Sequence, residues 1–491
     1  MGEESGHTAD SPELNPEMSS LLSANVIKVS SGTAVSQVLM FLSALILARL
    51  FDPETFGISA IVFYTAMVLS VGSSLSYERA IIMTKSETDA AILFALCFVL
   101  LFINVSLLLP LIYFFQDAFV NFLNIQNDKE WVWAIPPLIV IGGAFQVLDS
   151  WDARVKKFGR QTNFRVAKNI FGALGQIVAG ISGSVHAGGL ILGRLFGHGI
   201  AVFCYGANVI AGEKLGLSDW RKGGRLLELV SRYKNFPFFT TVTSLLHTIS
   251  LVIPVLLLGV FFSPFVVGLY ALSNRIISVP MTLAGRSVAN ILYREAAELE
   301  SDGRLGAMVD VVVPRLLVYA FIPFIFFFIL GDLLALLIGD RWQEAGLYTQ
   351  ILSPFLLVWF VSSPLSQLVN VKERQGTGMV LQILILSSKV VPLIIGGTRG
   401  DARLAVILFS IGTFIAYGLH SWWLISVSDG SVVRALQASA AAFLLFTPVL
   451  VVLVGAKWWL DVEPLILLCL TVSLLCIQFV LVVLRDRRLY G

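Results

Sequence analysis

Runs of about twenty apolar residues follow one another through most of the 491-residue chain, and this succession constrains the fold more than any other feature. A helix needs ~20 apolar residues to cross a bilayer. The chain is 57% hydrophobic and only 13% charged, whereas soluble globular proteins average ~45–50% and ~25%. The sequence therefore excludes an ordinary soluble enzyme and predicts an all-α polytopic membrane protein. Windows of ~19 residues place about fourteen spans near 25–48, 57–77, 89–111, 131–150, 166–186, 189–211, 236–262, 265–290, 311–338, 347–370, 377–396, 402–425, 434–455 and 464–484.

The cationic residues are distributed unevenly between the predicted loops. With the amino terminus in the cytoplasm, the loops on that side contain 24 of the 34 Lys and Arg residues, and the opposite loops contain six. Because cytoplasmic loops are enriched in Lys and Arg, we expect both termini to be cytoplasmic. The net charge of only +2 predicts no nucleic-acid partner. Residues 1–22 contain five acids and no Lys or Arg, which predicts a disordered acidic cytoplasmic tail rather than a signal peptide.

A short motif occurs twice and predicts an internal repeat. Phe51–Gly57 (FDPETFG) and Phe262–Gly268 (FSPFVVG) share Phe, Pro and Gly at an offset of 211 residues. Six predicted spans separate the two copies, so both have the same orientation in the membrane and an axis along the membrane normal relates them. The predicted units are the tail, a six-helix lobe over 23–212, a cytoplasmic amphipathic linker over 213–235, a second six-helix lobe over 236–426, and two extra helices with a basic tail over 427–491.

The connections and motifs argue against catalysis by this chain. The longest outer connection, near 112–130, is too short to hold a catalytic domain, and two inner connections, 220–235 and 293–310, are predicted to form helices at the membrane interface. The sequence contains no GxxxxGK[ST], HExxH or GxSxG motif, as a phosphate loop, a zinc protease or a serine hydrolase requires. We expect no enzyme activity, no cofactor and no metal site.

The remaining four cations are assigned to the membrane interior rather than to a loop, namely Arg194, Arg275, Arg286 and Lys389. Arg275 and Lys389 lie near the middle of their spans, where an ionised group costs at least ~2.5–3.5 kcal/mol and should face a wet or polar interior. All 32 acids fall near span ends or in loops. The pattern predicts a cationic cavity that binds an anion through Arg275, Lys389 and Arg194. The alternatives are bonds from Arg275 and Lys389 to helix carbonyls, helix packing around Arg194, and an Arg286 side chain that extends towards the inner surface.

His247, Pro254, Pro280 and Pro323 lie within three successive predicted spans of the second lobe. His247 lies near the middle of its span, where it could carry a proton during transport or serve only as a hydrogen-bonded packing residue. Pro254, Pro280 and Pro323 interrupt three successive spans and free helix carbonyls. Hinges at these prolines, or static bends, are both consistent with the sequence.

Several segments, spread over roughly residues 25–425, resemble one family in their order and spacing. The segments are Asn25–Thr33 (NVIKVSSGT), Arg49–Gly57 (RLFDPETFG), Tyr77–Ile81 (YERAI), Gly268–Arg275 (GLYALSNR) and Arg294–Leu299 (REAAEL). They resemble the polysaccharide-transport branch of the multidrug/oligosaccharidyl-lipid/polysaccharide exporter superfamily, which includes O-antigen and exopolysaccharide flippases. Ser76 departs from the family pattern, which has Arg before Tyr-Glu, and Arg79 follows nearby.

The resemblance implies a MATE-like pair of lobes around a central cavity in the bacterial inner membrane. Through it an undecaprenyl-diphosphate-linked oligosaccharide would pass to the periplasmic leaflet, for O-antigen, capsule or exopolysaccharide synthesis. The implied partners are this lipid-linked substrate, membrane lipids, a polysaccharide polymerase and the export machinery. Arg275 lies in a matching segment, whereas Arg194 and Lys389 are proposed from depth alone. The alternatives are a drug/cation antiporter of the same superfamily, which should place a carboxylate at depth, and an assembly scaffold.

Overall fold

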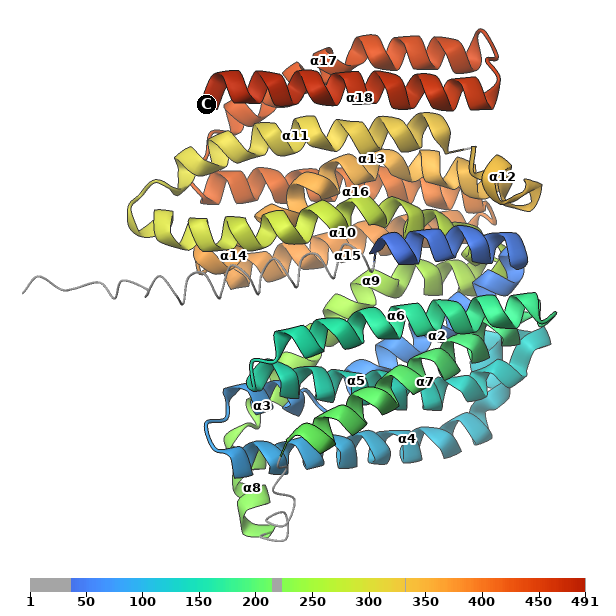
Figure 1. The fold of residues 1–491 in the computed structure, drawn as a ribbon, viewed down its shortest axis with the longest axis vertical. Coiled ribbons are helices and arrows are strands. Elements are labelled where there is room, and N and C mark those ends of the chain that lie inside the picture. The colour runs from blue at the N-terminus through green and yellow to red at the C-terminus, as the bar shows by residue number, and fades with distance from the viewer. Residues whose placement is uncertain (1–36, 214–222, 332, 491) are drawn as a thin grey trace, which may run out of the picture.

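All regular elements in the described chain are helices. The computed structural model describes residues 37–213, 223–331 and 333–490, and over these residues the long helices lie side by side (Figure 1). This confirms the predicted all-α class. The acidic tail predicted over 1–22 lies outside the described residues.

The first bundle contains the helices before residue 213. Its second helix begins at Pro53, a position where a missing N–H costs nothing, and the Asp52 carboxylate accepts a 2.8 Å bond from the Thr55 amide. Ser86 caps the fourth helix in the same way. The elements are Gln37–Leu50, α2 (Pro53–Val71), α3 (Tyr77–Met83), α4 (Glu87–Leu123), η1 (Gln126–Ala134), α5 (Ile135–Arg154), α6 (Phe158–Ile181) and α7 (Ala187–Gly212).

The second bundle follows the connecting helix α8 (Gly223–Arg232), and two further helices pack beside it (Figure 1). The last two, α17 and α18, pack against α11, where Phe321 stacks on Phe446 with ring centroids 5.4 Å apart. The elements are η3 (Phe236–Thr240), α9 (Thr241–Phe261), α10 (Pro264–Ser301), α11 (Leu305–Leu330), α12 (Leu333–Ile338), η4 (Asp340–Trp342), α13 (Gln343–Leu365), α14 (Leu368–Val371), α15 (Gln375–Thr398), α16 (Ala402–Val427), α17 (Val432–Trp458) and α18 (Pro464–Tyr490).

Each predicted span overlaps a helix. Not all of these helices are both long and apolar enough over their described residues to cross a membrane. Eleven helices of the described chain meet that criterion. Gln37–Leu50 is apolar but short over its described part, and α6 and α10 are not among the eleven. A multi-span membrane protein is confirmed, whereas the count of fourteen spans stays a prediction.

The predicted repeat appears as a reciprocal contact between α2 and α10. Both helices begin at the proline of the repeated motif. A Cβ added to Gly57 would lie 1.7 Å from the Pro264 carbonyl oxygen, and one added to Gly268 would lie 1.8 Å from the Pro53 oxygen. Only glycine permits this approach. The glycine of each copy of the motif therefore lies against the proline of the other copy. Two copies related by a two-fold axis must make such matching contacts.

The first helix of each bundle also contacts the other bundle. From the second bundle, Trp342 donates a 2.7 Å bond to the Ala48 carbonyl, while Arg49 donates a 2.6 Å bond to the Leu337 carbonyl. In the opposite direction, α9 packs against α2, and Thr241 shares a 2.9 Å hydroxyl bond with Ser76 in the turn before α3. These crossed contacts join the two bundles.

Two predicted connections differ from the structure. Residues 112–123 continue α4 rather than forming an outer loop, because their apolar residues extend the helix before Asn124 adopts a left-handed conformation. Residues 293–301 likewise continue α10 and do not form a separate interface helix. Helix α8 does form within the predicted inner segment 220–235, and the start of that segment lies outside the described residues.

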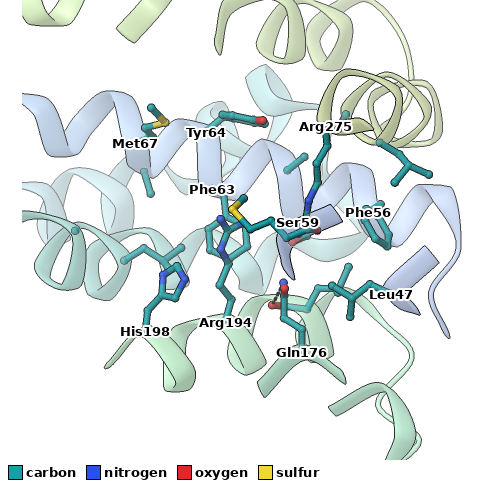
Figure 2. Close-up of a pocket in the computed structure, with 18 of the residues that line it drawn as sticks. Leu47, Phe56, Ser59, Phe63, Tyr64, Met67, Gln176, Arg194, His198 and Arg275 are labelled. Atoms are coloured by element: carbon teal, nitrogen blue, oxygen red, sulfur yellow. Dashed lines mark hydrogen bonds between the residues drawn. The ribbon is translucent and has the colours of Figure 1, made fainter. Parts of the chain in front are cut away.

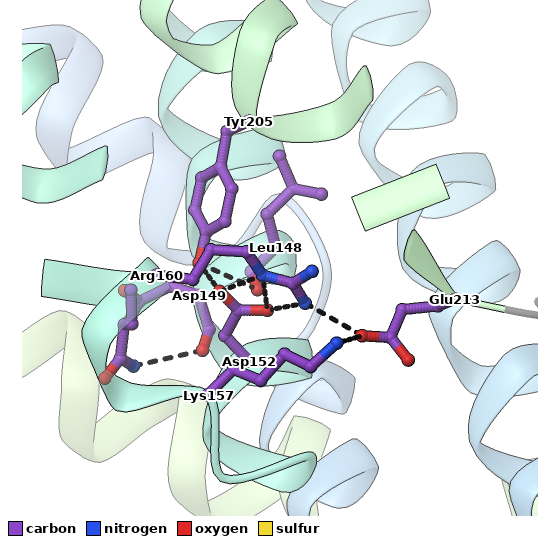
Figure 3. Close-up of polar contacts among 8 residues, drawn as sticks. Leu148, Asp149, Asp152, Lys157, Arg160, Tyr205 and Glu213 are labelled. Carbon is purple, nitrogen blue, oxygen red and sulfur yellow. Dashed lines mark hydrogen bonds and ion pairs between the residues drawn. The ribbon is translucent and has the colours of Figure 1, made fainter. Parts of the chain in front are cut away.

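A polar cluster holds α5, α6 and α7 together at one end of the first bundle (Figure 3). Asp152 is fully buried and accepts bonds from Arg160 and, at 2.9 Å, from the Tyr205 hydroxyl. Glu213 accepts bonds from Lys157 at 2.5 Å and from Arg160 at 3.1 Å. Burial alone would raise the pKa of Glu213, but these bonds outweigh it and hold the pKa below its ordinary value. The three helices are thereby fixed relative to one another.

Candidate functional site

A cavity of about 390 Å³ lies between the first bundle and α10 (Figure 2). The first bundle supplies wall residues from Gln37–Leu50, α2, α5, α6 and α7. The basic residues of the cavity wall, from both bundles, are Lys168, Arg194, His198 and Arg275. Neutral polar groups on the wall are Ser59, Tyr64, Ser70, Gln176, Asn274 and Ser278.

Arg194 and His198 enter the cavity from α7. They are four residues apart, so they lie on the same helix face, and Figure 2 shows both side chains directed towards α2. The Arg194 guanidinium lies 4.1 Å from the centre of the Phe63 ring, a cation–π contact. The neighbouring Gly193 and Gly197 pack against α6, where an added Cβ would meet backbone atoms at 2.5 Å and 2.1 Å. In this segment of α7 the glycines therefore pack against α6, while Arg194 and His198 line the cavity.

Lys168 and Gln176 enter from α6. The Lys168 ammonium lies 3.7 Å from the centre of the Phe145 ring, and Gln176 donates a 3.0 Å bond to the Leu190 carbonyl. Gly172 lies between them on the same face, and an added Cβ there would lie 2.6 Å from the His198 ring. The glycine thus leaves room for the histidine beside the two polar groups.

Arg275 is the charged contribution of the second bundle. One terminal nitrogen, Nη2, donates bonds of 3.0 Å to the Met40 carbonyl and 3.1 Å to the Ser43 hydroxyl. Its Nε is buried without a hydrogen-bond partner in the structure. A guanidinium has five N–H donors, so these two bonds leave donors available to a ligand.

No Asp or Glu of the described residues lines this cavity. The buried carboxylates have partners elsewhere: Glu78 accepts bonds from Ser74 at 2.6 Å and Gln146 at 3.2 Å, and Asp152 belongs to the cluster of Figure 3. The wall is consequently cationic without a compensating acid, which suits an anionic ligand.

The other predicted site residues lie elsewhere. Lys389 is only 6% exposed and its ammonium donates to Ser250 of α9, outside the cavity that Arg194 and Arg275 share. His247 lies on an exposed face of α9 and does not line that cavity. The Arg286 side chain lies outside the described residues. The roles predicted for Lys389 in substrate binding and for His247 in proton coupling stay predictions.

The sequence analysis did not predict two residues of the cavity wall, Lys168 and His198. Lys168 is counted with the cations of the inner loops because it lies only two residues from the predicted start of its span at residue 166, whereas α6 begins at Phe158 and places Lys168 well inside the helix. The helical spacing of Lys168, Gly172 and Gln176 is the signal that places them on one face. His198, one turn after Arg194, carries the same kind of signal.

Two packed bundles around a shared cavity define the class: a two-lobe, all-α fold of a multi-span membrane protein. The solved structures that share it include the following three. They are the lipid II flippase MurJ in an inward closed conformation (TM-score 0.69, 15% identity, 94% of this chain and 99% of that one), an inward-facing multidrug resistance MATE transporter of the MOP superfamily (0.50, 14%, 83% and 96%) and the Vibrio cholerae MATE transporter VcmN in its bent form (0.51, 14%, 87% and 98%).

Residues 46–346 match the family model described as "Polysaccharide biosynthesis protein", and the chain therefore belongs to that family. No protein of curated function matches the chain. The family and the fold of the MOP superfamily together confirm the resemblance drawn from the sequence.

Proposed function

We propose that this protein is a flippase that moves an undecaprenyl-diphosphate-linked oligosaccharide across the bacterial inner membrane for polysaccharide synthesis, with both termini cytoplasmic. The observation that carries the proposal is the cavity whose wall combines Lys168, Arg194 and Arg275 without an acid among the described residues. The proposal is also supported by the polysaccharide biosynthesis family and by the fold shared with a lipid II flippase.

The cations suit a diphosphate in particular. Guanidinium groups donate two parallel bonds to phosphate oxygens, and an ammonium adds a point charge. Arg194 comes from the first bundle and Arg275 from the second, so a diphosphate bound to both would contact both bundles. The neutral polar groups Gln176 and Asn274 lie on the same wall and offer hydrogen bonds to sugar hydroxyls.

The size of the cavity is consistent with a headgroup site. Small-molecule sites measure ~300–1,000 Å³, and this cavity measures about 390 Å³. The apolar polyprenyl chain gains nothing from a cationic wall and would remain in lipid. In this scheme the headgroup crosses between the bundles while the chain follows in the bilayer.

The test measures binding to the purified protein in detergent. The probes are undecaprenyl diphosphate, undecaprenyl monophosphate and the lipophilic cation tetraphenylphosphonium. We expect the diphosphate to bind at least roughly tenfold more tightly than the monophosphate, the factor for one additional charge-assisted bond, and Lys168→Ala to weaken it. Lys85→Ala is the matched control, because Lys85 is exposed and lies outside the cavity.

Tight binding of tetraphenylphosphonium with no preference for the diphosphate would contradict the proposal and favour the antiporter. In cells lacking the native gene, lipid-linked repeat units should accumulate in the cytoplasmic leaflet, and the parent chain should restore the polymer. If polymer forms normally without the chain and without any substitute transporter, the proposal fails.

A further inference from the structure

Pro254 removes a hydrogen bond from the middle of α9. Proline has no N–H, so the carbonyl four residues earlier, that of Ser250, loses its helix donor. Ser250 is only 2% exposed, and a buried carbonyl without a partner is costly. The Ser250 carbonyl therefore requires a hydrogen-bond donor from outside α9.

Lys389 of α15 supplies that donor. Its Nζ lies 2.8 Å from the Ser250 carbonyl oxygen and 3.3 Å from the Ser250 hydroxyl. The ammonium also faces the Tyr417 ring, 5.9 Å from its centre. Among the described residues no carboxylate forms an ion pair with Lys389. Within the described part of the chain, the shortest hydrogen bond of this buried charge thus goes to the carbonyl that Pro254 frees.

Helix α9 touches the first bundle at both of its ends. Near its start, Thr241 bonds to Ser76 at 2.9 Å and Ser244 accepts a 2.9 Å bond from Arg79. Just beyond its end, the Phe262 carbonyl accepts a bond from Asn124. Ser250 and Pro254 lie between these contacts, so the shape of α9 at that point determines whether both ends reach the first bundle together.

We propose that Lys389 is a positioning residue for transport: its ammonium replaces the hydrogen bond that Pro254 removes and holds α9 in the shape that joins the two bundles. This role differs from substrate binding. A lysine that binds substrate matters whatever residue stands at position 254. A lysine that acts through the freed carbonyl matters only while Pro254 is present, because an alanine at 254 restores a backbone N–H to the helix.

The experiment is a double-mutant cycle of Lys389→Met and Pro254→Ala. The first readout is oxidative cross-linking of Ser76→Cys with Thr241→Cys, in a chain whose four native cysteines are replaced by alanine. Lys389→Met should lower cross-linking roughly tenfold or more, the factor for one charge-assisted bond, and Pro254→Ala should restore it. The control pair, Ser362→Cys with His420→Cys, joins α13 to α16 and should not change; these side chains lie 2.7 Å apart.

The second readout is polymer export, which rests on the proposed function, whereas cross-linking does not. Export should fall in Lys389→Met and recover in the double variant, while affinity for undecaprenyl diphosphate stays within about twofold of the parent in all variants. Equal losses in both backgrounds, or a loss of affinity with unchanged cross-linking, would overturn the proposal. If Lys389→Met does not accumulate in the membrane, Lys389→Gln takes its place: because its neutral amide keeps a weaker donor, cross-linking should fall by less than about tenfold and recover with Pro254→Ala, and an equal loss in both backgrounds would overturn the proposal.

Discussion

Replacement of Arg275 tests the cationic cavity at the residue where the two bundles meet. Its Nη2 already bonds to Met40 and Ser43, and its buried Nε has no partner, so the ligand gains the remaining donors. A charge-assisted hydrogen bond contributes ~1.5–3 kcal/mol. Arg275→Ala should therefore weaken binding of undecaprenyl diphosphate by roughly ten- to a hundredfold.

The structural cost of that variant should be small. The Met40 carbonyl lies inside the helix Gln37–Leu50 and keeps its helix partner, and the Ser43 hydroxyl also donates a 2.9 Å bond to Met40. Arg275→Lys should bind with intermediate affinity, since an ammonium cannot form the parallel pair of bonds. Arg275→Glu should abolish both binding and export.

The assay is lipid binding by each purified variant, together with polymer production in cells lacking the native gene. The amount of each variant in the membrane is measured first, because a misfolded chain would mimic the loss. Arg403→Ala is the control: its exposed guanidinium pairs with Glu344 outside the cavity, and it should change affinity less than about twofold. Normal insertion and parental export by Arg275→Glu would refute the mechanism.

Three further predictions follow from the fold. Gly57→Ala should lower the unfolding temperature, because overpacking costs ~1–3 kcal/mol and its Cβ would meet backbone at 1.7 Å, whereas Gly72→Ala, with open space around it, should not; equal midpoints would contradict the close packing. The lowered pKa of Glu213 means that its contribution to stability is present above the ordinary pKa of a Glu and is lost as pH falls through the folded-state pKa. The unfolding temperature of the parent should therefore decline more steeply below about pH 5 than that of Glu213→Gln, and parallel curves would argue against this pair. Reporter fusions after Gly397 and after Asp429 should report periplasm and cytoplasm respectively, and the reverse result would invert the topology.

The sequence alone was sufficient for the class of fold and for the internal repeat. Twenty-residue apolar runs leave the backbone no alternative to helices in a bilayer, and the spacing of the repeated Pro and Gly determines that α2 and α10 are equivalent. Depth within a span also identified Arg194 and Arg275, because a charge in the membrane interior must face a polar space.

Only the tertiary structure decided which cations line the same cavity. Depth along a helix does not specify the side on which a residue lies relative to its neighbours, so depth alone does not distinguish Lys389 from Arg275. The structure directs Arg275 to the cavity and Lys389 to the Ser250 carbonyl. Lys168 joined the cavity because α6 begins eight residues earlier than its apolar run, and helix packing rather than local hydropathy sets that start. Contacts between distant segments depend on side-chain packing across the two bundles, which no local pattern encodes.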